Sequence, residues 1–381
     1  DEFTHRKTLL DGLPWRSPEK GPWWKNEDDS CLRNYLEEVY NITGKMVIDD
    51  ALQEVIGRNS YHAVQDYLQA QEWDEIPRVD SLFIDYLGAD DTEFNRAITR
   101  KTLVAAVARV MKPGIKYDTV LTFIGRQGLG KSYIWKRLGH GWTSDSLSTV
   151  TGKDAMEQIK GAWIIELAEL AALRKSELEA VKQFITKQDD SFRPAYGRET
   201  EHYLRQCIFV ATTNVSDFIK DQTGGRRWWP MQVGLQPAKL DLFKDLTDEE
   251  VGQVWAEAVH LYQAGEPLYL DQSMSKTASD LQRQHMEESS WAGPIGAYID
   301  IPLPENWDSM ATPERREYIG GDGFDRAPGT VRRERVCALE IWVELMGGEI
   351  KNLSRQQSIE INNIMRSMDG WEPAKSGLRF G

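Results

Sequence analysis

Cysteine is scarce in this sequence, and long apolar runs are missing. The three cysteines, Cys31, Cys207 and Cys337, lie far apart without CxxC spacing. This spacing argues against a zinc site and against a disulfide framework, and it fits a reducing cytoplasm. Because the chain has neither a run of about 18 apolar residues nor an N-terminal signal pattern, we expect a protein that is neither secreted nor membrane-spanning.

Several kinds of catalytic motif are also missing. The sequence has no acid cluster typical of a primase, no zinc knuckle and no paired-histidine nuclease motif. We expect each of its scattered histidines to be structural or on the surface, and they are His5, His62, His140, His202, His260 and His285. The abrupt start at Asp1 and end at Gly381 suggest a piece of a longer polypeptide. A primer-making activity of the whole protein would therefore lie in a part outside these residues.

The chain also lacks a net positive charge. The formal net charge is −14, so the molecule as a whole repels nucleic acid, and any binding must use a local basic surface. The chain has 381 residues, of which 40% are hydrophobic and 28% charged. These values are typical of a soluble globular protein with two or three domains.

Hydrophobic patterning predicts an α/β core between two helical regions. Three β-branched and aromatic runs are expected to be buried strands, and they are residues 120–124, 162–165 and 207–211. Helical patterns lie around and between them, at residues 30–40, 61–71, 92–111, 132–138, 175–186, 248–263, 275–288, 333–346 and 354–368. Residues 302–330, rich in proline and glycine, are typical of a loop-rich junction. The alternation of strand and helix implies a largely parallel sheet with helices packed on it.

The stretch after the first strand carries the most specific motif. Residues 125–132 read GRQGLGKS and satisfy G-x-x-x-x-G-K-[ST]. The glycines permit positive φ, so backbone N–H groups can converge on phosphate oxygens at a helix start. Lys131 would supply charge to the β- and γ-phosphates, and the Ser132 hydroxyl would join a Mg²⁺ shell. The residues expected to hold the phosphates are Gly125, Gln127, Gly128, Leu129, Gly130, Lys131, Ser132 and Tyr133.

Hydrolysis also needs acids that organise the metal and polarise the attacking water. An apolar strand delivers Glu166 at its C-terminal edge, where α/β ligand sites lie, and Glu169 follows three residues later. We expect Glu166 to contact Mg²⁺ and one of the two acids to activate water. Both could instead be solvated acids at a helix N-terminus, which are common.

Three more polar groups complete the predicted site. Asn214 ends the third strand and could orient the attacking water, although asparagine is also frequent in turns for its own hydrogen bonds. Arg226 and Arg227 follow two glycines, and one of them could reach a phosphate as an arginine finger from a neighbouring subunit. Stacking of an arginine on Trp228 or Trp229 at the core edge is the alternative.

These motifs occur in one order with several others, at residues 59–62, 72–78, 107–114, 166–170, 181–184, 190–196, 212–214 and 224–228. With them the sequence resembles the virulence-associated protein E family of phages, prophages and pathogenicity islands, which is related to superfamily-three helicases and poxvirus-type primase-helicases. The resemblance implies an AAA+-like ATPase that assembles as a ring, usually a hexamer, in the cytoplasm of a bacterial host. Such a ring would move along or melt single-stranded or forked DNA during replication of a mobile element.

The resemblance also implies roles for the site residues. It assigns ATP and Mg²⁺ to Lys131 and Ser132, the second acidic motif to Glu166, and the sensor position to Asn214. Superfamily-three helicases usually place two acids side by side, whereas Glu166 and Glu169 are three residues apart. Which of the two acids activates water, and which of the paired arginines is the finger, therefore stays open.

The predicted division of the chain has four parts. They are an N-terminal helical collar or oligomerisation domain at 1–112, a P-loop ATPase core at 113–245, a helical extension at 246–310 and a winged-helix-like C-terminal region, truncated at a possible wing, at 311–381. In the core, residues 193–205 are predicted to form a hairpin that points into the ring channel. The cations expected to touch DNA are Lys182, Lys187, Arg193 and Arg198. An ordinary surface turn is the alternative, because Glu199 and Glu201 weaken the basic character of this segment.

Three other functions share part of this signature. A small-molecule P-loop kinase would need a lid with arginines and an acceptor pocket, and it has no use for a long helical N-terminal region. A non-translocating replication initiator or helicase loader has the same loop, acids and finger, so sequence separates it poorly from a helicase. A switch that binds ATP without turnover is disfavoured by the intact Glu166, Asn214 and Arg226.

Overall fold

The computed structural model describes residues 1–9, 11–17, 19, 21–168, 175–192, 200–219, 225–285, 289–321 and 329–374. The chain divides into two compact units, Asp1–Met286 and Glu287–Gly381. No helix in the described ranges is both long and apolar enough to cross a lipid bilayer.

A five-stranded sheet forms the centre of the first unit. Its strand order is β2-β3-β6-β1-β7, and every pairing between neighbours is parallel. The strands are β1 (Val120–Ile124), β2 (Thr143–Ser144), β3 (Ile164–Ala168), β6 (Ile208–Thr213) and β7 (Trp228–Gln232). The predicted α/β class with a largely parallel sheet is thus confirmed.

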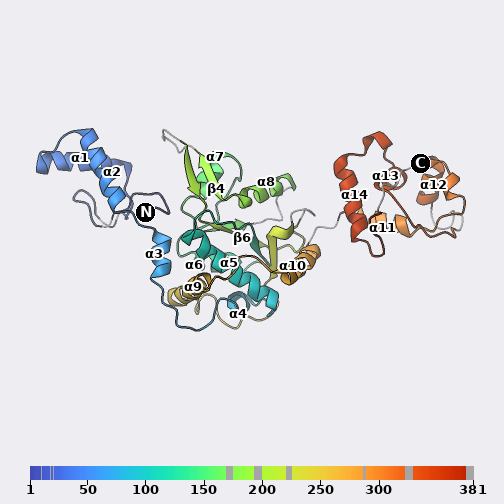
Figure 1. The fold of residues 1–381 in the computed structure, drawn as a ribbon, viewed down its shortest axis with the longest axis horizontal. Coiled ribbons are helices and arrows are strands. Elements are labelled where there is room, and N and C mark those ends of the chain that lie inside the picture. Colours follow the sequence, from blue (N-terminus) through green and yellow to red (C-terminus); the bar gives the residue numbers. More distant parts are fainter. Residues whose placement is uncertain are drawn as a thin grey trace. The chain divides into compact units, whose positions relative to one another are not determined.

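Helices cover both faces of this sheet. Because side chains alternate along a strand, Leu121 and Phe123 of β1 pack into one core while Val120 and Ile124 pack into the other. The first core includes residues of α4 (Leu82–Leu87), α5 (Glu93–Met111), α6 (Lys131–Leu138) and α9 (Asp248–Gln263). The second includes residues of α7 (Gly152–Gln158) and α8 (Lys175–Thr186). Figure 1 shows these two groups on opposite sides of the strands.

One hydrophobic core crosses two of the predicted domain boundaries. It joins Leu103 of α5, Phe123 of β1 and Trp255 of α9, all fully buried. Residues on both sides of positions 112 and 245 therefore share the same packing. The division of the chain into four functional parts stays a prediction.

Four more helices lie in the described part of the first unit. They are α1 (Asn26–Tyr40), α2 (Lys45–Arg58), α3 (Ala63–Gln69) and α10 (Gln272–Gln284). Helix α10 packs beside the edge strand β7, where the Gln282 side chain donates a 2.7 Å hydrogen bond to the Trp228 carbonyl. The predicted helical character of the N-terminal region agrees with α1 to α5.

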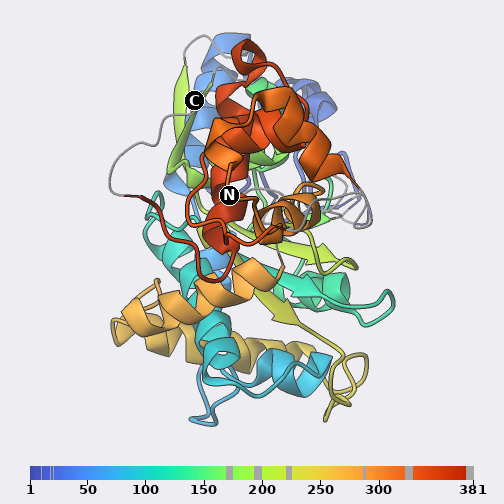
Figure 2. The same ribbon diagram turned by 90° about the vertical axis from the view of Figure 1, so that its right-hand side faces the viewer.

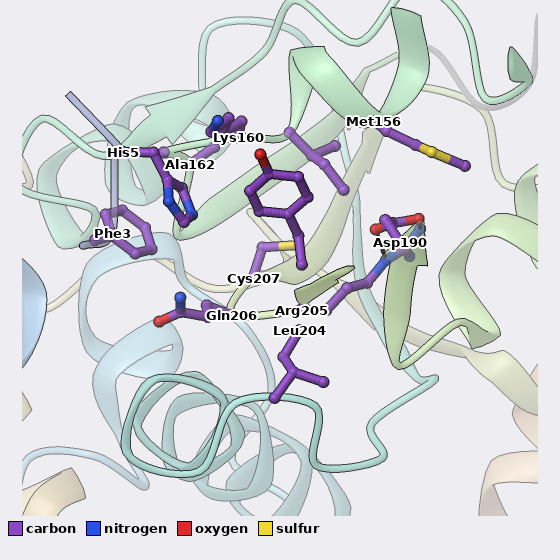
Figure 3. Close-up of a pocket in the computed structure, with 13 residues that line it drawn as sticks. Phe3, His5, Met156, Lys160, Ala162, Asp190, Leu204, Arg205, Gln206 and Cys207 are labelled. Carbon is purple, nitrogen blue, oxygen red and sulfur yellow. Dashed lines mark hydrogen bonds and ion pairs between the residues drawn. The ribbon is translucent and has the colours of Figure 1, made fainter. Parts of the chain in front are cut away.

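A separate antiparallel hairpin precedes β6. It pairs β4 (Asp189–Phe192) with β5 (Glu201–Leu204), so its first strand begins before the predicted start at residue 193. The Arg205 guanidinium at its base donates to both Asp190 oxygens, at 2.6 and 2.9 Å, and both side chains are buried. Figure 3 shows these two side chains pointing toward each other. Arg193 and Arg198 lie outside the described residues.

The second unit is helical where it is described. It contains α11 (Ala292–Asp300), α12 (Thr312–Gly320), α13 (Ala338–Glu340), a π-helical turn at Ile341–Leu345 and α14 (Arg355–Ser367), drawn in orange to red in Figure 2. The expectation of a loop-rich junction at 302–330 missed α12, which begins with Pro313 in its first turn, a position that proline favours. A strand for the predicted wing does not occur within 289–321 or 329–374, and the winged-helix prediction stays untested.

Candidate functional site

The loop at 125–130 joins β1 to α6 at the carboxyl edge of the sheet. Gly128 and Gly130 have φ of +86° and +82°, a region that side chains other than glycine rarely adopt. A Cβ on Gly130 would lie 2.3 Å from Leu242 Cδ2, and a Cβ on Gly125 would lie 2.7 Å from the Val233 carbonyl oxygen. The backbone conformation of Gly130 therefore requires glycine, and the Leu242 side chain would have to move to admit a larger residue.

Lys131 is the first residue of α6, and its side chain reaches back to this loop. Its ammonium donates to the carbonyl oxygens of Gly125 and Arg126, at 2.6 and 3.0 Å, and to Asn214 Oδ1 at 2.8 Å. Burial lowers the pKa of Lys131, and the negative charge of Glu166 opposes this shift. The ammonium thus links the phosphate-loop motif to the end of β6, and Lys131 and Asn214 are brought together as the sequence predicts.

Glu166 lies beside the start of α6. Its Oε1 atom accepts hydrogen bonds from the Ser132 hydroxyl at 2.5 Å and from the Thr212 hydroxyl at 2.6 Å. Glu166 is 3% exposed, so these two donors hold a carboxylate that is largely shielded from solvent. Ser132 and Glu166, predicted to share a metal ion, are therefore in direct contact.

Thr212 is a site residue that was predicted only as part of the motif at 212–214. In the β3–β6 pairing, Glu166 is opposite Val210, and Thr212 lies two residues further along the same face. The hydroxyl reaches the carboxylate because these strands are neighbours. Only the register between β3 and β6, which are separated by 39 residues of chain, could have revealed this contact, and the residue pattern does not encode that register directly.

The donor set fits the magnesium and triphosphate that the motif predicts. Mg²⁺ prefers oxygen ligands and usually takes only one or two from protein side chains, with phosphates and water supplying the rest. Ser132 and Glu166 offer such oxygens beside an ammonium and a glycine-lined turn. The site also lies at the end of β1. In the strand order, β6, β3 and β2 lie on one side of β1 and β7 lies on the other. Parallel sheets bind ligands at such a switch point.

The remaining predicted loop residues have separate surroundings. The Tyr133 ring is 4.8 Å from the Phe243 ring. Leu129 packs under the backbone at Gly234, where an added Cβ would lie 2.6 Å from its side chain, and Gln127 is exposed. Glu169 lies outside the described residues, so the choice between the two acids is open.

Arg226 and Arg227 do not join this group of residues. They precede β7, whose first residue Trp228 is opposite Val120, the first residue of β1. Both arginines therefore lie at the amino edge of the sheet, and the five residues of β1 separate them from the loop by about 16 Å. There they line a cavity of about 290 Å³. Arg227 Nε is 3.3 Å from the Thr186 hydroxyl.

The cations predicted to touch DNA differ in exposure. Lys182 is 2% exposed, and its ammonium lies 3.2 Å from Glu179 Oε1, which weighs against a contact with DNA in this conformation. The Lys187 side chain is 42% exposed and lies 3.9 Å from Asp190. Lys187 therefore remains accessible to a large ligand.

A second, smaller cavity lies beneath the hairpin (Figure 3). It is lined by Phe3 and His5 of the N-terminal segment together with Lys160, Arg205 and Cys207. Its volume of about 50 Å³ is far below the roughly 300 Å³ or more that small-molecule sites need. A nucleotide does not fit there, so the carboxyl edge stays the candidate site.

The sequence profile of the virulence-associated protein E-like domain matches residues 68–287, more than half of the chain. The chain belongs to this family. The resemblance read from the motifs is thus confirmed, and the VapE-like domain contains the complete carboxyl-edge site, from Gly125 to Asn214.

Solved structures with a detectable likeness include two apo structures of the C-terminal region of NrS-1. One is 16% identical with a TM-score of 0.41, over 68% of this chain and 62% of that one. The other is 14% identical with a TM-score of 0.41 and the same shares. Less than two thirds of the NrS-1 region is therefore covered. No curated protein matches the chain.

Proposed function

We propose that this chain is an ATPase of a phage or mobile genetic element that acts in replication by moving on or unwinding DNA. In this proposal the core is an AAA+-like P-loop domain, and subunits assemble in the bacterial cytoplasm as a hexameric ring around single-stranded or forked DNA. The observation that carries the proposal is the convergence of Lys131, Ser132, Glu166 and Asn214 at one edge of the parallel sheet. Membership of the family supports it.

Each residue then has a task that its position favours. The ammonium of Lys131 exchanges its carbonyl partners for β- and γ-phosphate oxygens of ATP. Ser132 and Glu166 would hold Mg²⁺, which would neutralise charge on the phosphates. Both hydroxyl donors reach Glu166 at Oε1, which leaves Oε2 to polarise the attacking water or to hold the metal's water. Asn214, exposed at the strand end, orients water beside the γ-phosphate.

The arginines act between subunits in this proposal. Because Arg226 and Arg227 lie at the opposite sheet edge from the loop of their own chain, they are available only to the nucleotide of another copy. A guanidinium forks onto anionic oxygens and stays charged, as a residue that completes a phosphate site must. Hydrolysis then removes contacts to the γ-phosphate at the interface between subunits, and the β4–β5 hairpin shifts along the DNA strand.

The test measures ATP turnover with and without single-stranded DNA, together with the mass of the particle in solution. DNA-stimulated turnover by a large oligomer is expected, and Lys131→Ala should remove it. Unstimulated turnover by a monomer would instead identify a non-translocating initiator or helicase loader. Absence of any ATP binding by the wild-type chain would overturn both.

A further inference from the structure

The turn between α5 and β1 contains a motif that the ATPase site does not use. It follows Arg109 and reads Lys112-Pro113-Gly114-Ile115-Lys116. Lys112 and Lys116 are both exposed, and neither has an ion-pair partner within the described residues. In a chain of net charge −14, two exposed lysines without acidic partners on one short turn are a local basic surface.

The backbone of this turn is fixed on every side. Ile115 N–H donates to the Lys112 carbonyl at 3.1 Å, which closes the turn. The buried Arg109 guanidinium donates to the Tyr117 carbonyl at 2.7 Å, and the Tyr269 hydroxyl donates to the Lys116 carbonyl at 2.8 Å. The two lysine side chains therefore extend from a rigid support, which lowers the entropy lost when they bind a ligand.

The same turn rests on the base of the β4–β5 hairpin. Gly114 N–H donates to the Arg205 carbonyl at 2.9 Å, and Arg205 N–H donates to the Gln188 carbonyl at 2.9 Å. Gly114 has φ of +80°, and a Cβ there would lie 3.2 Å from Leu204 Cδ2. Leu204 and Arg205 are both labelled in Figure 3. These backbone hydrogen bonds connect the turn, Gln188 and the hairpin base at the amino edge of the sheet.

We infer that Lys112 and Lys116 bind the phosphate backbone of single-stranded DNA, as a fixed contact beside the hairpin. The inference rests on the proposed function, because it takes DNA as the ligand. Lysine ammonium groups suit this task, since they are strongly hydrated point charges that pair with phosphates without reading sequence. Lys187, one residue before Gln188, is exposed nearby, and its ammonium lies 3.9 Å from Asp190.

The experiment measures the affinity of the wild-type chain for a fluorescein-labelled oligothymidylate by anisotropy, across a series of salt concentrations. Each lysine–phosphate contact adds about 0.7 to the salt slope for a single strand. The variant Lys112→Gln/Lys116→Gln should therefore lower the slope by about 1.4 and weaken binding about tenfold at low salt. The variant Lys112→Arg/Lys116→Arg should retain the wild-type slope.

The matched control is Lys25→Gln/Lys45→Gln, which removes the same charge from two exposed lysines, one just before α1 and one at the first residue of α2. It should change the slope little. A melting temperature equal to that of the wild type shows that a variant is folded.

Equal slopes for the Lys112→Gln/Lys116→Gln variant and the wild type would overturn the inference and leave the ATPase proposal intact. A changed particle mass with unchanged DNA affinity would assign the turn to contacts between copies and also overturn it. Failure of the wild type to bind any oligonucleotide would remove the DNA part of the proposed function as well.

Discussion

Glu166 is the residue on which turnover is expected to depend most. Glutamine at this position can still accept the Ser132 and Thr212 hydroxyls through its carbonyl oxygen, so the local structure should survive. It cannot take a proton from water, and loss of such a base typically costs about 10²–10⁴ in rate. Glu166→Gln should therefore keep nucleotide binding, measured with a fluorescent ATP analogue, while phosphate release falls about 10²-fold or more. Normal hydrolysis by this variant would move the catalytic role to another acid.

Thr212 is expected to act as a positioning residue through its bond to Glu166. Valine has the same shape without the hydroxyl, and a hydrogen bond to a charged group contributes about 1.5–3 kcal/mol. Thr212→Val should slow turnover about tenfold or more and leave the KM for ATP nearly unchanged, whereas Thr212→Ser should restore the rate. An effect on KM alone would contradict this role.

At the residue scale, local motifs were predictable and spatial neighbours were not. The loop at 125–132 is a contiguous pattern with a known physical reason for each position. Thr212 and Leu242 contribute to the same site from distant positions, and no spacing rule connects them to it. The burial of Lys182 was equally inaccessible, because it depends on which side of α8 faces the core.

At the scale of elements, the β4–β5 hairpin should depend on its buried ion pair. Asp190→Asn leaves the Arg205 guanidinium buried opposite an uncharged amide, and breaking such a pair typically costs about 3–5 kcal/mol. Faster hydrogen exchange is expected in β4 and β5, measured by mass spectrometry, with little change in β1. As a control, Asp190→Leu/Arg205→Met removes both charges and should recover most of the protection. Unchanged exchange in Asp190→Asn would show that the pair does not stabilise the hairpin.

Helices and strands were predicted with correct bounds where the hydrophobic residues of a segment follow one clear period. Residues 120–124, 175–186 and 248–263 were expected with the bounds that β1, α8 and α9 have. Strand β7 was not among the predicted strands. It contains Pro230, which is tolerated there because β7 is an edge strand. Strand β2 has two residues, too few for any period.

At the scale of the whole molecule, the two units should respond differently to nucleotide. If ATP analogue with Mg²⁺ binds the proposed site in the folded first unit, it should stabilise that unit by about 2.7 kcal/mol when its concentration is 100 times Kd. Scanning calorimetry should show one transition that rises with nucleotide and one that does not. Lys131→Ala should abolish the rise, whereas Lys136→Ala, an exposed lysine on the same helix, should not. A shift of both transitions would mean that the units unfold together.

The division of the chain into units was harder to predict from the sequence than the residues of the candidate site. The contact of α5 and α9 with the sheet gives residues 82–110 and 246–258 one core, although the sequence between them changes period twice. Composition indicates where helices and strands change, and it does not indicate which of them share a core.

The two edges of the sheet are separate halves of one predicted site, and this separation permits complementation. A copy with Lys131→Ala keeps its arginines, and a copy with Arg226→Ala/Arg227→Ala keeps its loop; each alone should be inactive. When the two are mixed, some junctions pair an intact loop with intact arginines, so part of the ATP turnover should return in proportion to such junctions. A mixture as inactive as its components would show that the arginines serve no partner.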